Sequence, residues 1–219
     1  MTARMLLEAG AVKYNAEQPY FLSSGWASPV YIDCQGLISF PRLRRSLMDF
    51  ASETVLEQAG FERFDAVAGA EPTGIAYAAW IAERLSLPLQ YVRRRPRGFG
   101  PEAQIVGSLR PGTRVLLVDD VTTDGRSKIE LCRALRATQS HVDHLLVMFF
   151  FDVFPETRAL LAELRIELHY LATWSDVLAE ARAAGYFTGP QAEEVDRFLQ
   201  SPARWSLEHG GISCFPGSA

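Results

Sequence analysis

The stretch that decides the fold runs Arg114-Val-Leu-Leu-Val-Asp-Asp-Val-Thr-Thr-Asp-Gly-Arg-Ser127. It opens with four apolar residues, Val115 to Val118, a pattern typical of a strand that is buried on both faces of a sheet. Two acids follow, Asp119 and Asp120, and then a loop of small polar residues. Directly after the loop, apolar residues from Leu131 to Leu135 recur at the spacing of a helix. The stretch therefore predicts a strand, a loop and a helix in immediate succession.

Such a loop is an anion site, because the first N–H groups of a helix have no intrahelical partner and the helix dipole favours negative charge. Hydroxyls, a conformationally free glycine and a cation strengthen it here: Thr122, Thr123, Gly125, Arg126 and Ser127. The two acids suit a vicinal diol instead, or Mg²⁺ held through water. A ribose 5-phosphate moiety offers both a phosphate and a diol. The alternative is an ordinary strand end with an Asp-Gly turn, which does not require paired acids beside three hydroxyls.

The same stretch resembles the phosphoribosyl-pyrophosphate (PRPP) motif of type I phosphoribosyltransferases. The resemblance implies an α/β fold with a mostly parallel sheet flanked by helices and a small N-terminal hood. It also implies that one continuous segment binds PRPP: Asp119, Asp120, Val121, Thr122, Thr123, Asp124, Gly125, Arg126 and Ser127. The motif is not a Walker A loop, since it lacks the Gly-Lys-Ser/Thr ending.

A second motif lies near the N-terminus, Leu22-x-Ser-Gly-x-x-Ser-Pro-x-Tyr-Ile-Asp33. Its apolar pairs are split by a Ser-Gly turn and predict a strand, a turn and a strand, in the plainer interpretation a hairpin on the domain edge. The motif resembles the hood over the pyrimidine in orotate phosphoribosyltransferases. It implies that orotate is bound by Tyr31, Ile32, Ser24 and Gly25, together with Thr123. Ser23 stands where many members carry a lysine, so one cation is missing or is supplied from elsewhere.

A second strand–loop–helix unit is predicted from a strand at 66–69, a loop at 70–74 and a helix at 75–85. The resemblance implies that Pro72 and Thr73 bind the pyrophosphate arm of PRPP and its Mg²⁺. Some relatives carry a lysine at the position of Thr73. A plain strand-to-helix connection remains an equal alternative for this loop.

Four arginines fall within five positions at the start of segment 93–107, which also contains three glycines and two prolines. Proline and glycine make it a poor helix or strand, so it is predicted to be a mobile loop, with a solvated charge run as the alternative. The resemblance implies that Arg93, Arg94 and Arg97 close over pyrophosphate in the neighbouring subunit, with Arg94–Gly107 shared across a homodimer. Phe99 replaces a usual histidine, and arginine does not donate a proton. Mg²⁺ and arginine charge would then stabilise the leaving group.

Further helices are predicted at 5–11, 42–58, 157–164, 177–184 (capped by 174–176) and 191–199, and further strands at 87–92, 143–151 and 166–172, with a frayed glycine-rich tail. Relatives often carry an arginine just after the strand at 143–151 that contacts the orotate carboxylate, and here the nearest is Arg158. His169 and His209 are interpreted as isolated structural or surface residues, with no second carboxylate–histidine cluster. Lys128 lies in an apolar helical stripe, which is anomalous unless it faces a ligand.

The chain has 219 residues, which we expect to form a single phosphoribosyltransferase domain, with a hood at about 1–40 and extra C-terminal helices at about 173–200. A net charge of −4 argues against nucleic-acid binding. Three scattered cysteines and the lack of a secretory signal pattern predict a cytoplasmic protein. The apolar run at 148–151 is too short to span a membrane.

Asp119, Asp120, Arg94 and Arg97 are the predicted catalytic residues, and no residue is predicted to ligate Mg²⁺ directly, since PRPP and water would hold it. The implied reaction is transfer of the phosphoribosyl group from PRPP to orotate, giving orotidine 5′-monophosphate and pyrophosphate in pyrimidine biosynthesis. Two alternatives stay open at this stage. One is a phosphoribosyltransferase for another base, and the other is a non-catalytic regulator that senses PRPP or a nucleotide on the same fold.

Overall fold

A central sheet organises the computed structural model, which describes residues 1–214 except for the side chains of residues 101 and 102. Its strand order is β10-β9-β8-β5-β6-β7. The strands are β5 (Ala66–Ala70), β6 (Leu89–Val92), β7 (Ile105–Val106), β8 (Arg114–Thr122), β9 (His141–Phe150) and β10 (Glu167–Tyr170). All neighbours are parallel except β6 and β7. The chain builds outward from β5 in one direction and from β8 in the other, so ligands are expected at the carboxyl ends of these two strands.

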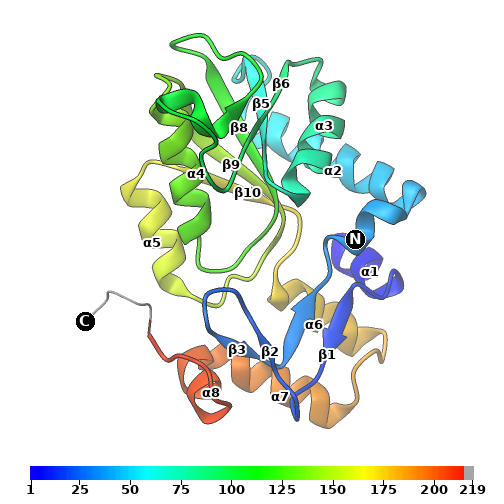
Figure 1. Ribbon diagram of the computed structural model, residues 1–219. Helices are drawn as coiled ribbons and strands as arrows, with labels where there is room; N and C mark the ends of the chain where they lie inside the picture. Colours follow the sequence, from blue (N-terminus) through cyan, green and yellow to red (C-terminus); the bar gives the residue numbers. More distant parts are fainter. Residues whose placement is uncertain (215–219) are drawn as a thin grey trace.

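Helices cover both faces of the sheet (Figure 1). One face packs against α2 (Pro41–Ala59) and α3 (Thr73–Leu85), and the other against α4 (Arg126–Arg136) and α5 (Pro155–Glu163). Successive strand residues serve opposite faces: Leu116 belongs to the first apolar core, whereas Leu117 belongs to the second. This confirms the predicted α/β class with a mostly parallel sheet.

The hood is built from an N-terminal and a C-terminal segment, and the blue strands and orange-red helices of these segments lie beside one another in the lower part of Figure 1. The N-terminal part is α1 (Thr2–Glu8), β1 (Val12–Tyr14), β2 (Tyr20–Phe21), β3 (Ala27–Ser28), β4 (Val30–Ile32) and a 3₁₀ turn at Gly36–Ser39. The C-terminal part is α6 (Trp174–Ala183), α7 (Gly189–Gln200) and α8 (Pro202–Glu208). Helix α1 contacts α6, and α8 contacts β3. The C-terminal helices therefore enlarge the predicted hood.

The N-terminal segment was predicted to form one hairpin, with the strand before the Ser-Gly turn paired to the strand at 30–32, and this pairing is wrong. Strand β2 pairs with β3 across the Ser-Gly turn, whereas β4 pairs with β1 in a separate two-stranded sheet. Pro29 lies between β3 and β4 and has no N–H to donate, while the N–H of Val30 donates to Ser28 Oγ. The chain changes sheets at this proline.

The C-terminal region also differs from the prediction. Helix α6 begins at Trp174, and its cap is Thr173, which forms a capping box with Asp176. The segment expected to fray contains α8, which the buried ring of Trp205 anchors. Residues 215–219 of the predicted tail lie outside the described residues.

Segment 93–107 is more ordered in conformation than a plain loop. It doubles back through positive φ angles at Gly98 and Gly100, and a 3₁₀ turn at Pro101–Gln104 leads into β7. The N–H of Arg93 donates to the carbonyl of Gln104 at 2.8 Å, so the two arms of the segment are joined. The prediction that it contains no regular structure is wrong, and its mobility remains a prediction.

No helix among residues 1–214 combines the length and the apolar character that a bilayer-spanning helix requires.

Candidate active site

A cavity of about 930 Å³ opens at the carboxyl ends of β5 and β8, between the sheet and the hood. Most of the residues predicted from the two motifs and the two loops line it: Ser24, Tyr31, Ile32, Pro72, Thr73, Arg94, Asp119, Asp120, Val121, Thr123, Asp124, Arg126 and Ser127. Five predicted residues are not part of its lining: Gly25, Arg93, Arg97, Thr122 and Gly125. The fold thus brings four separate sequence segments to one cavity.

The turn between β8 and α4 forms one wall. Gly125 caps α4 at a φ of 75°, a conformation that glycine adopts without strain. A Cβ at this position would also lie 3.1 Å from Cγ2 of Thr157, so space and conformation both favour glycine. Asp124 Oδ1 accepts the N–H of Arg126 at 3.2 Å, which holds the turn against the start of the helix. The turn is therefore fixed at the start of α4 beside the cavity, and anion binding by it remains a prediction.

The two acids are both buried, although neighbouring strand residues point to opposite faces. Asp119 Oδ1 accepts the N–H of Asp120, and Asp120 Oδ1 accepts the N–H of Val121. Burial, followed by the nearby charge of Asp119, raises the pKa of Asp120 to about 7. A carboxyl group in this state gains from any ligand that brings a hydrogen-bond donor or a positive charge.

Lys128 is a site residue that the sequence-based list of candidates omitted. Its Nζ lies 2.5 Å from Oδ2 of Asp119, both side chains are buried, and the lysine lines the cavity. The only signal in the sequence was a lysine in the apolar stripe of a helix. The structure explains that anomaly, because the stripe ends at the acid pair.

The β5–α3 loop packs directly on the acids. A Cβ on Gly74 would lie 2.6 Å from the carbonyl oxygen of Val118 and 2.8 Å from Oδ1 of Asp119, distances that no side chain tolerates. The absence of a side chain lets the first turn of α3 approach the end of β8. Pro72 and Thr73 therefore reach the cavity, which supports a site at this loop over a plain connection.

The arginine segment contributes three residues to the cavity of its own chain, namely Arg94, Pro96 and Gln104, and Arg94 is its only arginine there. The backbone N–H of Arg94 donates to Glu71 Oε2, and its Nε donates to the Glu71 carbonyl, both at 3.1 Å. The Arg93 guanidinium lies instead 6.0 Å from the ring centroid of Tyr91. Arg97 donates its backbone N–H to Ala103 within the segment.

Two predicted site residues have buried hydroxyls without a hydrogen-bond partner among residues 1–214, namely Ser24 and Thr122. An unpartnered buried hydroxyl is costly and is satisfied when a ligand or a water bonds to it. Arg158, by contrast, forms a bidentate pair with Asp152 at 2.6 and 2.8 Å and does not line the cavity. It is therefore not placed as the cation for an orotate carboxylate.

A parallel sheet, an acid pair, a glycine-capped helix and a hood around one cavity define the type I phosphoribosyltransferase fold. Solved structures agree with this class. The orotate phosphoribosyltransferase of Aeropyrum pernix is 32% identical, with a TM-score of 0.72 over 86% of this chain and all of that one. UMP synthase of Leishmania donovani has a TM-score of 0.77 at 27% identity, over 91% of this chain and 41% of that one.

Curated relatives narrow the class. Orotate phosphoribosyltransferase of Ruegeria sp. strain TM1040 is 53% identical over 94% of this chain and 91% of its own length. That of Sinorhizobium medicae is 48% identical over 97% of this chain and 91% of its own length. No protein-family model matches the chain. The chain belongs to the orotate phosphoribosyltransferase family.

Proposed function

We propose that this enzyme transfers the 5-phosphoribosyl group of PRPP to orotate and releases orotidine 5′-monophosphate and pyrophosphate, a step of pyrimidine biosynthesis. The observation that carries the proposal is the buried acid pair beside the α4 N-terminus, inside a cavity that the hood partly encloses. The similarity to curated orotate phosphoribosyltransferases supports it, because the sequences are 53% and 48% identical over 94% and 97% of this chain.

Asp119 and Asp120 accept the two hydroxyls of the ribose in this proposal. As the bond from C1 to pyrophosphate loosens, C1 gains positive charge, and the nearby carboxylates stabilise it. The pKa of Asp120 is raised in the folded chain. A hydrogen bond from the ribose diol and the positive charge that develops at C1 both lower it, so the ionised form of Asp120 is increasingly favoured as the reaction proceeds. Lys128 holds the Asp119 carboxylate in place through its Nζ.

The 5′-phosphate is bound by the turn 123–127, whose residues Thr123 and Ser127 line the cavity at the start of α4, where the first helical N–H groups favour an anion. Fixing the phosphate fixes the distance from C1 to the attacking nitrogen of the base. Orotate lies against the hood, at Tyr31, Ile32 and the buried hydroxyl of Ser24.

Pyrophosphate departs toward Pro72, Thr73 and Arg94, which line the side of the cavity nearest β5 and β6. Glu71 and Thr73 of the same loop also line the cavity and offer a carboxylate and a hydroxyl, the ligand types that Mg²⁺ prefers, so the site fits an ion held mainly by PRPP and water. When bound, Mg²⁺ neutralises charge on the departing pyrophosphate. Arginine charge adds to that stabilisation without supplying a proton.

The proposed assembly is a homodimer in which the Arg94–Gly107 segment acts in the neighbouring active site. In the isolated chain Arg94 lies at its own cavity, so complementation separates the two arrangements. If the segment is shared, equal mixtures of Arg94→Ala and Asp120→Asn chains regain about a quarter of wild-type turnover, because half of the dimers carry one intact site. Mixtures that stay as inactive as each variant alone would show that the segment acts within its own chain.

We also propose that residues 1–219 act as a single phosphoribosyltransferase domain in the cytoplasm. The scattered cysteines support this location, since Cys34, Cys132 and Cys214 are all free.

The test of the transfer reaction is a steady-state assay that follows loss of orotate in the presence of PRPP and Mg²⁺. The expected result is turnover with orotate that exceeds turnover with adenine, hypoxanthine and uracil. Turnover only with another base would identify a different phosphoribosyltransferase. Binding of PRPP without any turnover would identify a regulator.

A further inference from the structure

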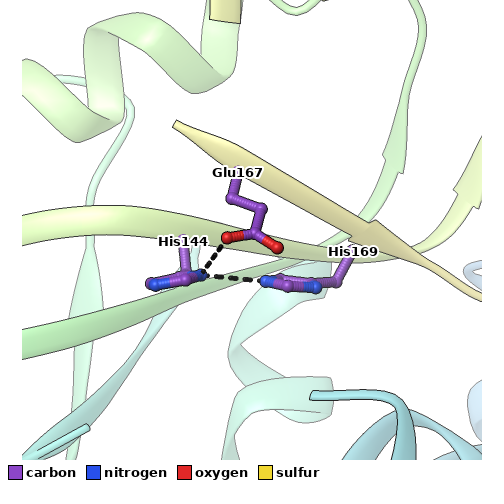
Figure 2. A group of neighbouring side chains, drawn as sticks. All are labelled: His144, Glu167 and His169. Atoms are coloured by element: carbon purple, nitrogen blue, oxygen red, sulfur yellow. Dashed lines mark hydrogen bonds and ion pairs between the residues drawn. The ribbon is translucent and has the colours of Figure 1, made fainter. Parts of the chain in front are cut away.

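A second buried polar cluster lies toward the amino ends of β9 and β10, at the opposite end of the sheet from the cavity. Figure 2 shows His144 of β9 facing His169 and Glu167 of β10. Both histidines are buried, whereas the glutamate side chain is half exposed. The expectation that His169 is isolated, and that no second carboxylate–histidine cluster exists, is wrong. Parallel pairing of His144 with Glu167 brings the three residues together.

The partners of the cluster fix where its protons lie. The Nε of Arg63 donates to His144 Nε2 at 3.0 Å, and a guanidinium has no acceptor, so this imidazole nitrogen carries no proton. His144 Nδ1 therefore holds the proton and donates to His169 Nε2 at 3.0 Å. His169 Nδ1 donates in turn to Gln58 Oε1 at 2.6 Å. Burial lowers the pKa of His169 to about 4 and also lowers that of His144.

The spacing of the donor atoms fits a tetrahedral ion. One nitrogen from each ring and one carboxylate oxygen lie within 4.8 Å of one another, with His144 Nδ1 at 3.0 Å from His169 Nε2 and at 3.5 Å from Glu167 Oε2. An ion with bonds of about 2.0–2.1 Å separates its ligands by about 3.4 Å, so the two nitrogens must part by a few tenths of an ångström, and the near-parallel rings must turn until both lone pairs point at the ion. The bond from His169 to Gln58 is the outer hydrogen bond that metal-bound histidines require.

We propose that His144 Nδ1, His169 Nε2 and the Glu167 carboxylate bind one divalent late transition ion, of which zinc is the reference. Two imidazoles and one carboxylate suit zinc or cobalt and not Mg²⁺, which takes oxygen ligands. A cavity of about 500 Å³, lined by Arg63, Asp143, His144, Ala162, Arg165, Ile166 and Glu167, gives access and leaves room for a water as fourth ligand. The site is separate from the proposed transfer reaction.

Arg63 opposes the ion and sets the affinity of the site. A neutral imidazole that binds metal through Nδ1 carries its proton on Nε2, which cannot face the N–H of Arg63. The arginine is exposed, so its side chain can swing away, but the lost hydrogen bond and the repulsion between two cations weaken binding. A glutamine at this position removes the charge and offers an oxygen that accepts the Nε2 proton.

The test is calorimetric titration of Zn²⁺ into the full chain, stripped with a chelator and carrying Cys214→Ser to remove the exposed thiol. The expected result is one saturable site per chain, with a melting temperature that rises as zinc is added. Glu167→Gln changes an exposed group, so it is expected to fold, and it should weaken binding by ~10-fold or more. Arg63→Gln should tighten binding. His141→Gln, which alters an exposed histidine of β9, is the matched control and should bind as its parent does.

His169→Asn removes a buried ligand and should abolish the site, with circular dichroism and orotate turnover serving as checks of folding. Cobalt provides an independent readout, because tetrahedral Co²⁺ gives visible bands that the same variants should remove. Three results would each overturn the proposal: no saturable zinc site in the parent chain, zinc binding that survives both Glu167→Gln and His169→Asn, or weaker binding in Arg63→Gln.

Discussion

Two buried polar clusters lie at opposite ends of the same sheet, one on β8 and the other on β9 and β10, and their hydrogen bonding differs. At the carboxyl end, burial and the nearby charge of Asp119 raise the pKa of Asp120, and the buried hydroxyls of Ser24 and Thr122 have no hydrogen-bond partner among residues 1–214. At the amino end, a one-way series of hydrogen bonds runs from Arg63 through two histidines to Gln58. The first cluster is destabilising until a ligand arrives, whereas the second is satisfied without one.

This contrast separates catalysis from stability. Removal of the Asp120 charge at the carboxyl end should reduce turnover and relieve repulsion in the folded state. Changes at the amino end should alter stability and metal affinity while orotate turnover stays within about two-fold. Both clusters contain buried titratable groups, so burial alone does not distinguish them. They differ in whether their buried polar atoms already have hydrogen-bond partners.

The largest expected effect comes from Asp120→Asn, which removes a charge next to the developing cation. Turnover of orotate should fall ~10²-fold or more, as measured by steady-state kinetics at saturating PRPP. Asp49→Asn, which alters an acid paired with Arg84 on the surface, is the control and should change turnover little. An unchanged rate in Asp120→Asn would remove this acid from the mechanism.

Lys128→Met should have the next largest effect, because it leaves Asp119 buried beside Asp120 without its partner. We expect turnover to fall ~10-fold and the free energy of unfolding to fall by about 3–5 kcal/mol, measured by urea denaturation. The double variant Lys128→Met/Asp119→Asn should regain most of the stability and none of the activity. Equal losses of stability in the single and double variants would contradict a buried ion pair.

Gly74→Ala tests the close approach of α3 to β8. The new Cβ has no room beside Val118 and Asp119, so the first turn must move, at a cost of about 1–3 kcal/mol in unfolding free energy. Turnover should fall several-fold, because the movement displaces Asp119. Gly189→Ala is the matched control, since a Cβ there meets nothing within 4 Å. Equal unfolding free energies and equal turnover in the two variants would show that the first turn of α3 moves away from β8 at no cost.

The smallest expected effect is the dependence of stability on pH. The folded-state pKa of Asp120 is raised to about 7 from 3.8, so the folded state binds an extra proton between these values. This carboxyl therefore disfavours folding increasingly as pH rises from about 4 to 7. Asp120→Asn should accordingly raise the melting temperature relative to wild type more at pH 8 than at pH 5. A gain that is greater at pH 5 would contradict the raised pKa.

Much of the fold and of the cavity could be predicted from the sequence, because local patterns determine them. The run Val115 to Val118 and the acids after it identified β8 and its ligand-facing end. The pairing of β4 with β1 depended on a distant partner strand, and no local pattern at Pro29 reveals it. Helix α8 was not predicted for the same reason, because Trp205, which anchors it, packs in a core with residues distant in the chain.

Residues that depend on tertiary contacts could not be predicted from the sequence either. Lys128 stood out as an anomaly, but only the fold places its Nζ beside Asp119. His144 and Glu167 are 23 positions apart, and strand register alone makes them neighbours. Arg93 and Arg97 were predicted at the site from the resemblance and lie outside the cavity lining of their own chain.

The most direct test of the central claim is a crystal structure of the chain with orotidine 5′-monophosphate. We expect the phosphate on turn 123–127, both ribose hydroxyls in contact with Asp119 and Asp120, and the pyrimidine under the hood at Tyr31. A nucleotide bound elsewhere while this turn holds none of it would contradict the account.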